Sequence, residues 1–345
     1  MENETKHTAR QQAILALLGK GSLPRIKIQN TLKARFKVSR VTLFRDLRSL
    51  INSGAVSTTG VGRATQYSLT SLNPLLVLPK KNFATSEVKF NFEIFGQLKN
   101  LLVPSEVLHL HSIYKSLNSQ IAKLDLTIAK RELERFIIEL AWKSSHIEGN
   151  TYSLLETETL IKTRQEAEGH SKEEATMILN HKSAFETILD HRHDFQRVDF
   201  KDVSQLHNTL IAGMNIDTGI RSHPVGVTGS IYRPLDNQWQ IREAMDKLMK
   251  ALDSLPHPFE KALVAASMIA YIQPFTDGNK RTSRMLSNAI LMAYDYFPIS
   301  YRAVNETDYK QALIYFYEQN SLIHFKRIFI EQYLHSLSNY FRTNN

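Results

Sequence analysis

A short polar loop between two apolar stretches, at residues 273 to 284, constrains this chain more than any other feature. The run from Ala262 to Ile272 is almost wholly apolar, and Pro274 follows it closely. Proline has no amide proton and disfavours helix in the residue before it, so the sequence predicts that a helix ends here. Gly278 and Asn279 tolerate left-handed backbone, which lets successive amides of a loop point into one anion-binding concavity.

The charges in this loop indicate which anion it suits. A second helix, predicted to start between Asn279 and Arg281, adds its positive N-terminal end to the concavity. Arg281 and Arg284 are three residues apart, so they share one helix face and can both reach a polyphosphate. Asp277 is a hard oxygen ligand of the kind that holds Mg²⁺ beside phosphates. The alternative from spacing alone is an ordinary Asp-Gly-Asn turn with solvent-facing cations.

The order Gln-Pro-Phe-Thr-Asp-Gly-Asn-Lys-Arg-Thr-Ser-Arg resembles the active-site motif of Fic-domain proteins, His-Pro-Phe-x-(Asp/Glu)-Gly-Asn-Gly-Arg-x-x-Arg. Gln273 departs from it by replacing the catalytic histidine, and Lys280 by replacing a glycine, as in the related Doc branch. Residues 206–234 resemble the family's second helix and its target-holding flap hairpin, and residues 309–333 its closing helices. Residues 144–150 resemble the inhibitory motif of autoinhibited members. The likeness spans roughly residues 85 to 335.

This resemblance implies a mechanism and a set of site residues. In the family, the histidine takes a proton from a protein hydroxyl, which attacks the α-phosphate of ATP, so that AMP is transferred. Asp277 would then hold Mg²⁺, and Arg284 would take the γ-phosphate. In the resting state Glu148 would pair with Arg284 and block that position. The remaining roles implied are phosphate binding by Gly278, Asn279, Lys280 and Arg281, with Arg281 also catalytic, inhibition by Ser144 and Gly149 together with Glu148, and target binding by Gly229, Ser230, Ile231 and Tyr232 of the flap.

Gln273 at the catalytic position limits the activity to be expected. A carboxamide can orient a hydroxyl but cannot take its proton, and losing general-base catalysis costs on the order of 10²- to 10⁴-fold. We therefore expect a weakened or inactive transferase acting as a regulator. The alternatives are an active adenylyltransferase that is self-inhibited through Glu148, and a Doc-like phosphotransferase suggested by Lys280. His207 is a substitute base by chemistry only, and a buried structural role suits it better.

The positive charge of the chain is concentrated at its start. Residues 1–70 hold 12 Lys and Arg against three acids, a net charge of +9 that equals the net charge of the whole chain. This asymmetry favours a polyanionic partner. Helices are predicted at 11–18, at 23–36 and, capped by Ser39, up to about residue 52. On the third, the residues expected to face a core are Leu43, Phe44, Leu47, Leu50 and Ile51. Residues 55–70 read as a two-stranded wing.

This order resembles a winged helix-turn-helix domain of bacterial repressors. Such a domain implies DNA binding, with Arg40, Thr42 and Arg45 of the third helix at base edges and Arg63 of the wing near phosphate or the minor groove. The alternative is a protein-interaction module with a solvated basic face.

We therefore predict a mainly α fold, an all-helical Fic-like core with a small β-hairpin flap, preceded by a winged helix-turn-helix domain. Zero cysteines, a polar start and no long apolar run suggest a cytoplasmic protein without a membrane segment. The expected cofactors are ATP and Mg²⁺, and the expected partners are DNA, a protein substrate that includes the chain itself, and a second copy of the chain. The predicted parts are 1–70 (winged domain), 71–95 (linker), 96–152 (helices with the inhibitory motif) and 153–345 (Fic-like domain and C-terminal helices).

Overall fold

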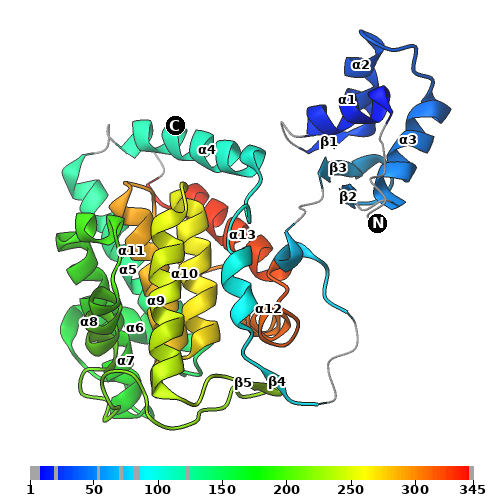
Figure 1. The fold of residues 1–345 in the computed structure, drawn as a ribbon. Coiled ribbons are helices and arrows are strands. Elements are labelled where there is room, and N and C mark those ends of the chain that lie inside the picture. Colours follow the sequence, from blue (N-terminus) through cyan, green and yellow to red (C-terminus); the bar gives the residue numbers. More distant parts are fainter. Residues whose placement is uncertain are drawn as a thin grey trace. The chain divides into compact units, whose positions relative to one another are not determined.

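The computed structural model contains two compact units, each with its own core (Figure 1). It describes residues 8–18, 22–52, 55–69, 73–80, 86–121 and 125–341. The front unit consists of the described residues up to Leu76 together with Asn100–His111, and the helical unit of Val77–Lys99 and the described residues from Ser112 onward. The predicted mainly α class is confirmed.

The front unit contains three helices and a small antiparallel sheet. The helices are α1 (Ala9–Leu18), α2 (Arg25–Lys33) and α3 (Arg40–Asn52), followed by the one-turn helices η1 (Gly62–Ala64) and η2 (Pro74–Leu76). The strands are β1 (Leu23–Pro24), β2 (Val56–Thr59) and β3 (Gln66–Leu69), in the order β1-β3-β2. The expected pairing within residues 55–70 is confirmed, with Val56 opposite Leu69. The side chain of Arg63 lies outside the described residues.

The starts of α2 and α3 follow from local chemistry. Ser39 accepts a hydrogen bond from the amide of Thr42 at 3.1 Å, which confirms the predicted N-cap. The prediction that the second helix begins at Leu23 was wrong, because Pro24 is in extended backbone (φ −72°, ψ 151°) and Leu23–Pro24 pairs with β3 as a strand. Proline is favoured at the start of a helix, but the residue before it disfavours helical backbone, so a helix rarely extends to positions preceding a proline.

One apolar face of α3 packs on the front-unit core. Leu43, Leu47 and Leu50 are buried, as predicted. The expectation for Phe44 and Ile51 was wrong, since they are 50% and 38% exposed. Both lie at the edge of the apolar stripe, where the 3.6-residue repeat turns them away from the face shared by the three leucines.

The helix α4 (Pro104–Ile121) begins in the front unit and ends in the helical unit. The described residues of the helical unit contain nine further helices, which are α5 (Leu126–Ile147), α6 (Leu154–Thr163), α7 (Lys172–Asp190), α8 (Phe200–Ile211), α9 (Gln238–Ser254), α10 (Pro258–Ile272), α11 (Asn279–Ala293), α12 (Glu306–Gln319) and α13 (Ile323–Asn339). The short elements are η3 (Phe92–Gln97), η4 (Arg192–Gln196), β4 (Val88–Lys89) and β5 (Tyr232–Arg233).

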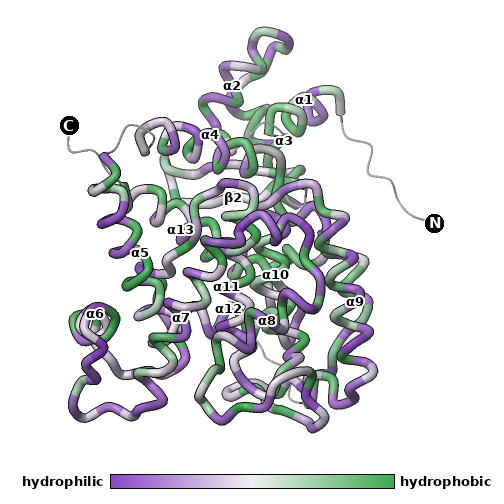
Figure 2. The backbone as a smooth tube through the Cα atoms, turned by 90° about the vertical axis from the view of Figure 1, so that its left-hand side faces the viewer, coloured by the Kyte–Doolittle hydropathy of each residue, from purple (hydrophilic) through white to green (hydrophobic). Residues whose placement is uncertain are grey.

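The core of the helical unit lies around α10 and α11. Every residue of α10 from Phe259 to Ile272 is buried, which agrees with the almost wholly apolar sequence from Ala262 onward. Figure 2 shows this helix in hydrophobic colours. It ends at Ile272, before Pro274, and α11 begins at Asn279, so both predicted bounds are confirmed. The pair therefore holds the loop of residues 273–278 on a rigid base.

The flap segment pairs differently from the prediction. Instead of a hairpin, the described residues 225–236 contain one two-residue strand, β5, which pairs in parallel with β4 from the expected linker. Val88 lies opposite Tyr232, and the amide of Val88 donates to the carbonyl of Ile231 at 3.3 Å. The segment was misassigned because its partner strand lies far away in the sequence. Among the described residues, no helix is long and apolar enough to cross a membrane.

Candidate nucleotide site

The loop between α10 and α11 is closed by left-handed backbone at both ends. Gln273 caps α10 at φ 52° and Gly278 precedes α11 at φ 78°. A side chain at Gly278 would be strained by this φ, and its Cβ would meet Ile211 at 3.2 Å. No side chain caps the start of α11, so its first amides and its positive end face whatever the loop encloses.

The side chain of Gln273 is held by the protein itself. Its Nε2 donates to the carbonyl of Ala270 at 2.7 Å, and its Oε1 accepts from Nδ2 of Asn279 at 3.0 Å. Asn279 also bonds both the amide and the carbonyl of Phe275, at 2.9 and 2.8 Å. Gln273 is only 8% exposed. The amide at the position of the motif histidine is therefore a structural part of the loop.

Arg221 fixes the same loop from outside. Its Nε donates to the carbonyl of Gln273 at 2.7 Å and its backbone amide to that of Pro274 at 3.0 Å. Its two terminal nitrogens bind the carbonyls of His223 and Leu235. Arg221, which is 3% exposed, thus joins the segments on both sides of β5 to the loop.

Arg281 and Asp277 lie together beside His207. Arg281 is buried, and its Nη2 contacts Oδ2 of Asp277 at 3.2 Å. His207 stacks on Phe275 at 3.7 Å between ring centroids, and its Nε2 binds the carbonyl of Asp277 at 2.9 Å. Burial lowers the pKa of His207, so the ring is neutral and Nε2 donates that bond. His207 therefore supports the loop structurally, which is the role expected from the sequence in preference to that of a substitute base.

Arg284 and Lys280 converge on Glu148 from α11. Arg284 is 1% exposed, and its Nη1 contacts Oε1 of Glu148 at 2.8 Å, while Nζ of Lys280 contacts Oε2 at 2.8 Å. Burial opposes ionisation of Glu148, but the two cations outweigh it and lower its pKa to about 2. In Arg284, burial disfavours the charge, yet Glu148 raises the pKa above its ordinary value. The carboxylate is therefore ionised and occupies both cations.

Ser144 completes the hold on Arg284. Its Oγ accepts from Nε of Arg284 at 3.0 Å, and its carbonyl accepts from Nη2 at 2.8 Å. Gly149, at φ 104°, turns the chain at the end of α5 directly after Glu148. Together, Ser144 and Glu148 accept one hydrogen bond from each of the three nitrogens of the Arg284 guanidinium, which holds it against the end of α5.

His181 of α7 is a site residue that sequence reasoning missed. Its Nδ1 lies 2.8 Å from the carbonyl of Met177 and therefore carries the proton, which leaves Nε2 to accept from the hydroxyl of Ser144 at 2.8 Å. Burial lowers the pKa of His181 to about 3, so this neutral tautomer persists. The chain from Met177 through His181 and Ser144 orients Arg284. No motif marks it, because it depends on the packing of α7 against α5.

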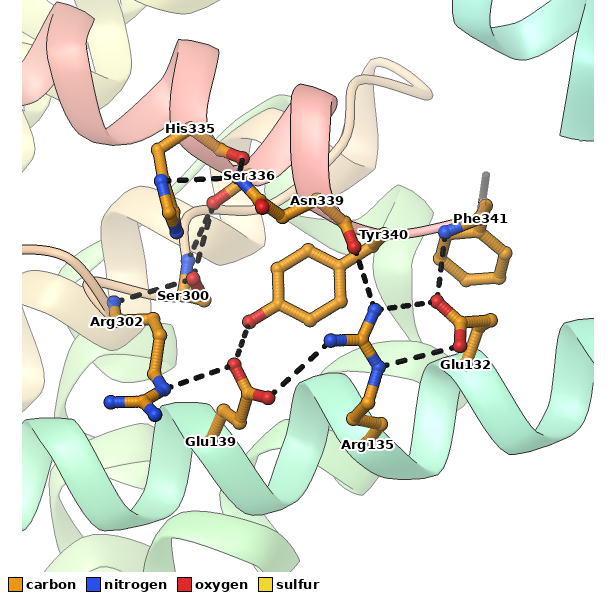
Figure 3. A network of polar contacts seen from close by, with 10 residues as sticks. All are labelled: Glu132, Arg135, Glu139, Ser300, Arg302, His335, Ser336, Asn339, Tyr340 and Phe341. Atoms are coloured by element: carbon orange, nitrogen blue, oxygen red, sulfur yellow. Dashed lines mark hydrogen bonds and ion pairs between the residues drawn. The ribbon is translucent and has the colours of Figure 1, made fainter. Parts of the chain in front are cut away.

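The C-terminal residues anchor α5, the helix that carries Ser144 and Glu148. Figure 3 shows the polar network, in which Glu139 accepts from the hydroxyl of Tyr340 at 2.6 Å. Arg135 donates to the carbonyl of Asn339 at 2.7 Å, and the amide of Phe341 donates to Glu132 at 2.9 Å. The end of α13 is thereby fixed along α5.

The flap residues are held by α12 and α10. The hydroxyl of Ser230 and the amide of Ile231 both donate to Oε1 of Glu318, at 2.6 and 3.1 Å. The hydroxyl of Tyr232 donates to the carbonyl of Tyr271 at 2.8 Å. Gly229 lies at φ 80° just before them. These contacts fix the segment next to the loop at 273–278.

The donor set suits Mg²⁺ bound together with phosphates. Asp277 is the one carboxylate within the loop, and its side chain is 68% exposed despite the contact with Arg281. Among the described residues, no group of three or more His, Cys, Asp or Glu could cage an ion. Magnesium is ordinarily held by one or two carboxylates, and phosphate and water fill its remaining positions. Asp277 can provide such a carboxylate.

Comparisons with known proteins match this region. Residues 197–291 match the sequence model of the Fic/DOC family. The chain is 31% identical over 187 residues to the protein adenylyltransferase Fic of Aedes aegypti, covering 52% of this chain and 37% of the relative, with the same values for Culex quinquefasciatus. It is 30% identical over 190 residues to that of Nematostella vectensis, covering 53% and 44%. The chain thus spans less than half the length of these relatives.

Solved structures share the fold. Fic-1 of C. elegans superposes with a TM-score of 0.57 at 20% identity, covering 68% of this chain and 69% of its own. A Fic family protein from Desulfovibrio desulfuricans gives a TM-score of 0.58 at 19% identity, covering 70% and 75%. At this identity the likeness supports the fold alone. The match to the family model, which covers the loop and the helices around it, identifies residues 197–291 as a Fic/DOC domain.

Proposed function

We propose that this chain is a regulator that joins a DNA-binding front unit to a nucleotide-binding Fic domain whose AMP transfer is weakened. The weakened AMP transfer is inferred from the side chain of Gln273 and its hydrogen bonds. It is bonded to Ala270 and Asn279, and it has no group that can take a proton from a hydroxyl. General-base catalysis is therefore missing at the position where the family motif has histidine.

The groups that would bind a triphosphate are present. The open N-terminal end of α11 offers amides from Gly278 onward, and Arg281 adds a buried cation beside them. Asp277 would hold Mg²⁺, which neutralises phosphate charge when it is bound. Positioning and charge stabilisation of this kind do not need a base. Nucleotide binding is therefore retained even where AMP transfer is lost.

Glu148 would keep the site closed to the γ-phosphate. Arg284 has its donors on Glu148 and Ser144, so a phosphate can reach Arg284 only when the carboxylate leaves. Lys280 strengthens the closed state through its own ion pair with Glu148. Release of Glu148 is therefore the step that admits MgATP.

The test is to incubate the wild-type protein and Glu148→Gly with MgATP labelled at the α- or γ-phosphate, and to follow intact mass. We expect tighter nucleotide binding by Glu148→Gly without rapid labelling of the protein. Rapid addition of AMP would contradict the weakened transferase, and transfer of the γ-phosphate would assign a Doc-like reaction. Glu158→Gly, which removes an exposed carboxylate of α6, serves as a matched control.

An active adenylyltransferase is the second candidate. It is favoured by the curated relatives, which are named protein adenylyltransferases and match 44–53% of this chain. It would need a base other than Gln273, and His207 is fully buried, with Nε2 bonded to the carbonyl of Asp277 and its ring stacked on Phe275. The same incubation separates the two candidates, since this one requires AMP on a Ser, Thr or Tyr of a target protein.

For the front unit we propose DNA binding. Asp46, the one acid in residues 8–69, is buried and paired with Arg10, so its charge does not offset the exposed cations. Arg40 and Arg45 are exposed on α3, the helix expected to enter the major groove. The alternative is a protein-interaction module, which would use the same surface without nucleic acid.

A mobility-shift series with DNA from upstream of the protein's own coding sequence tests this proposal. We expect a complex that weakens steeply as salt rises, because phosphate contacts release counterions. Arg45→Ala should weaken it, whereas Arg327→Ala, which removes an exposed arginine of α13, should not. Absence of any salt-dependent complex would favour the interaction module.

A further inference from the structure

Apolar and cationic side chains alternate on the exposed face of α3. Val41 is 76% exposed, and Arg45 and Arg48 are exposed as well. The 3.6-residue repeat places these three within roughly 60° of one another around the helix, and Phe44, 50% exposed, borders them. Leu43, on the opposite side, is fully buried in the front-unit core. The exposed valine is therefore not a displaced core residue.

Besides Arg40, Thr42 is the polar side chain in the first turn of α3. The hydroxyl of Thr42 lies 2.8 Å from that of Ser39, and the Thr42 amide donates to Ser39. Thr42 is thus engaged in the cap that starts the helix, although the sequence had suggested it as a base contact. Val41, which lies between Arg40 and Thr42 in the sequence, is exposed.

An apolar side chain between cations on such a helix matches one feature of the major groove. Thymine is the base that presents a methyl group there, while guanine presents two acceptors that suit arginine. We propose that Val41 reads a thymine methyl, with Phe44 beside it, in a site where Arg40 or Arg45 contacts guanine. This inference rests on the proposed DNA binding of the front unit and names what that surface recognises.

The charges around the valine favour DNA over a protein groove. Arg40, Arg45 and Arg48 flank it, and no exposed acid stands among the described residues of α1, α2 and α3. A protein partner would have to match three arginines around a small apolar patch, whereas a duplex provides phosphates along both walls of the groove.

The experiment uses the full-length protein and duplexes that it selects from a randomised pool. Each thymine of a selected duplex is replaced in turn by deoxyuridine, which removes the methyl group alone. We expect one or two positions at which the affinity falls about four-fold, the worth of one buried methyl-sized group. Val41→Ala should lose this dependence while still binding in a salt-dependent manner. Val77→Ala, an exposed valine of the helical unit, should behave as the wild type.

The outcomes separate the inference from the proposed function. Selection of no DNA at any salt concentration would overturn DNA binding and the methyl contact together. A strong complex whose affinity is unchanged by deoxyuridine at every position would overturn the methyl contact alone. Retained deoxyuridine dependence in Val41→Ala would also overturn it. Because Val41 is exposed and alanine favours helix, the variant should fold, which circular dichroism checks.

Discussion

Replacing Glu148 by glutamine should open the nucleotide site at a measurable cost in stability. Glutamine keeps the shape of the side chain and removes the charge that Arg284 and Lys280 share at 2.8 Å each. The pKa of Glu148 falls from an ordinary 4.5 to about 2 in the folded protein. At about 1.4 kcal/mol for each pKa unit, the charged contacts stabilise the closed site by about 3 kcal/mol.

That energy sets the expected change in affinity. If MgATP must displace Glu148 from Arg284, the apparent Kd of the wild type is raised by the full closing energy, or about 10²-fold. Glu148→Gln should therefore bind MgATP about 10²-fold more tightly while its unfolding free energy falls by about 3 kcal/mol. Calorimetry gives the first quantity and denaturant unfolding the second.

A matched control distinguishes occlusion from general loosening. Glu158 forms an exposed pair with Lys162 on α6, so Glu158→Gln should change neither quantity appreciably. If Glu148→Gln loses stability but binds MgATP with unchanged affinity, Glu148 is only a structural ion-pair partner and the self-blocking account is refuted.

Three further results are expected. The stability advantage of the wild type over Glu148→Gln should be complete above the ordinary carboxyl pKa of 4.5 and disappear as pH falls through about 2, because the folded-state pKa is the lower one; acid titration of both proteins measures it. Arg221→Lys should lower the unfolding free energy by about 3 kcal/mol by leaving buried carbonyls unbonded, and an unchanged melting temperature would contradict this role. Tyr340→Phe should cost about 1–2 kcal/mol in thermal unfolding, since it removes the 2.6 Å bond to Glu139; no loss would mean that the C-terminal end does not anchor α5.

Local signals made the loop and its two helices predictable. Pro274 marks the end of α10, and Gly278 supplies the left-handed residue before α11, so both bounds follow from nearby residues. The pairing of Glu148 with Arg284 was expected only from resemblance, since the two residues are separated by 136 positions.

The remaining features depend on contacts that sequence patterns do not encode. The flap was predicted as a hairpin, but β5 pairs with β4, which lies in the expected linker. Nothing in the sequence near β5 indicates this distant partner. His181 acts through the packing of α7 on α5, and Arg221 through carbonyls of a distant loop. Phe44 was assigned to the core because the sequence does not show where the apolar stripe of a helix ends. In the structure Phe44 lies at the edge of the stripe and is half exposed.

The most direct test of the central claim compares AMP transfer in two proteins that differ only at position 273. With Glu148→Gly in both, one keeps Gln273 and the other carries Gln273→His. Labelled AMP from MgATP is followed on the protein itself and on added proteins, with MgATP affinity measured in parallel. Our account predicts similar affinities and a rate at least about 10²-fold higher with histidine, because a general base is restored. Equally fast transfer by the two proteins would contradict it.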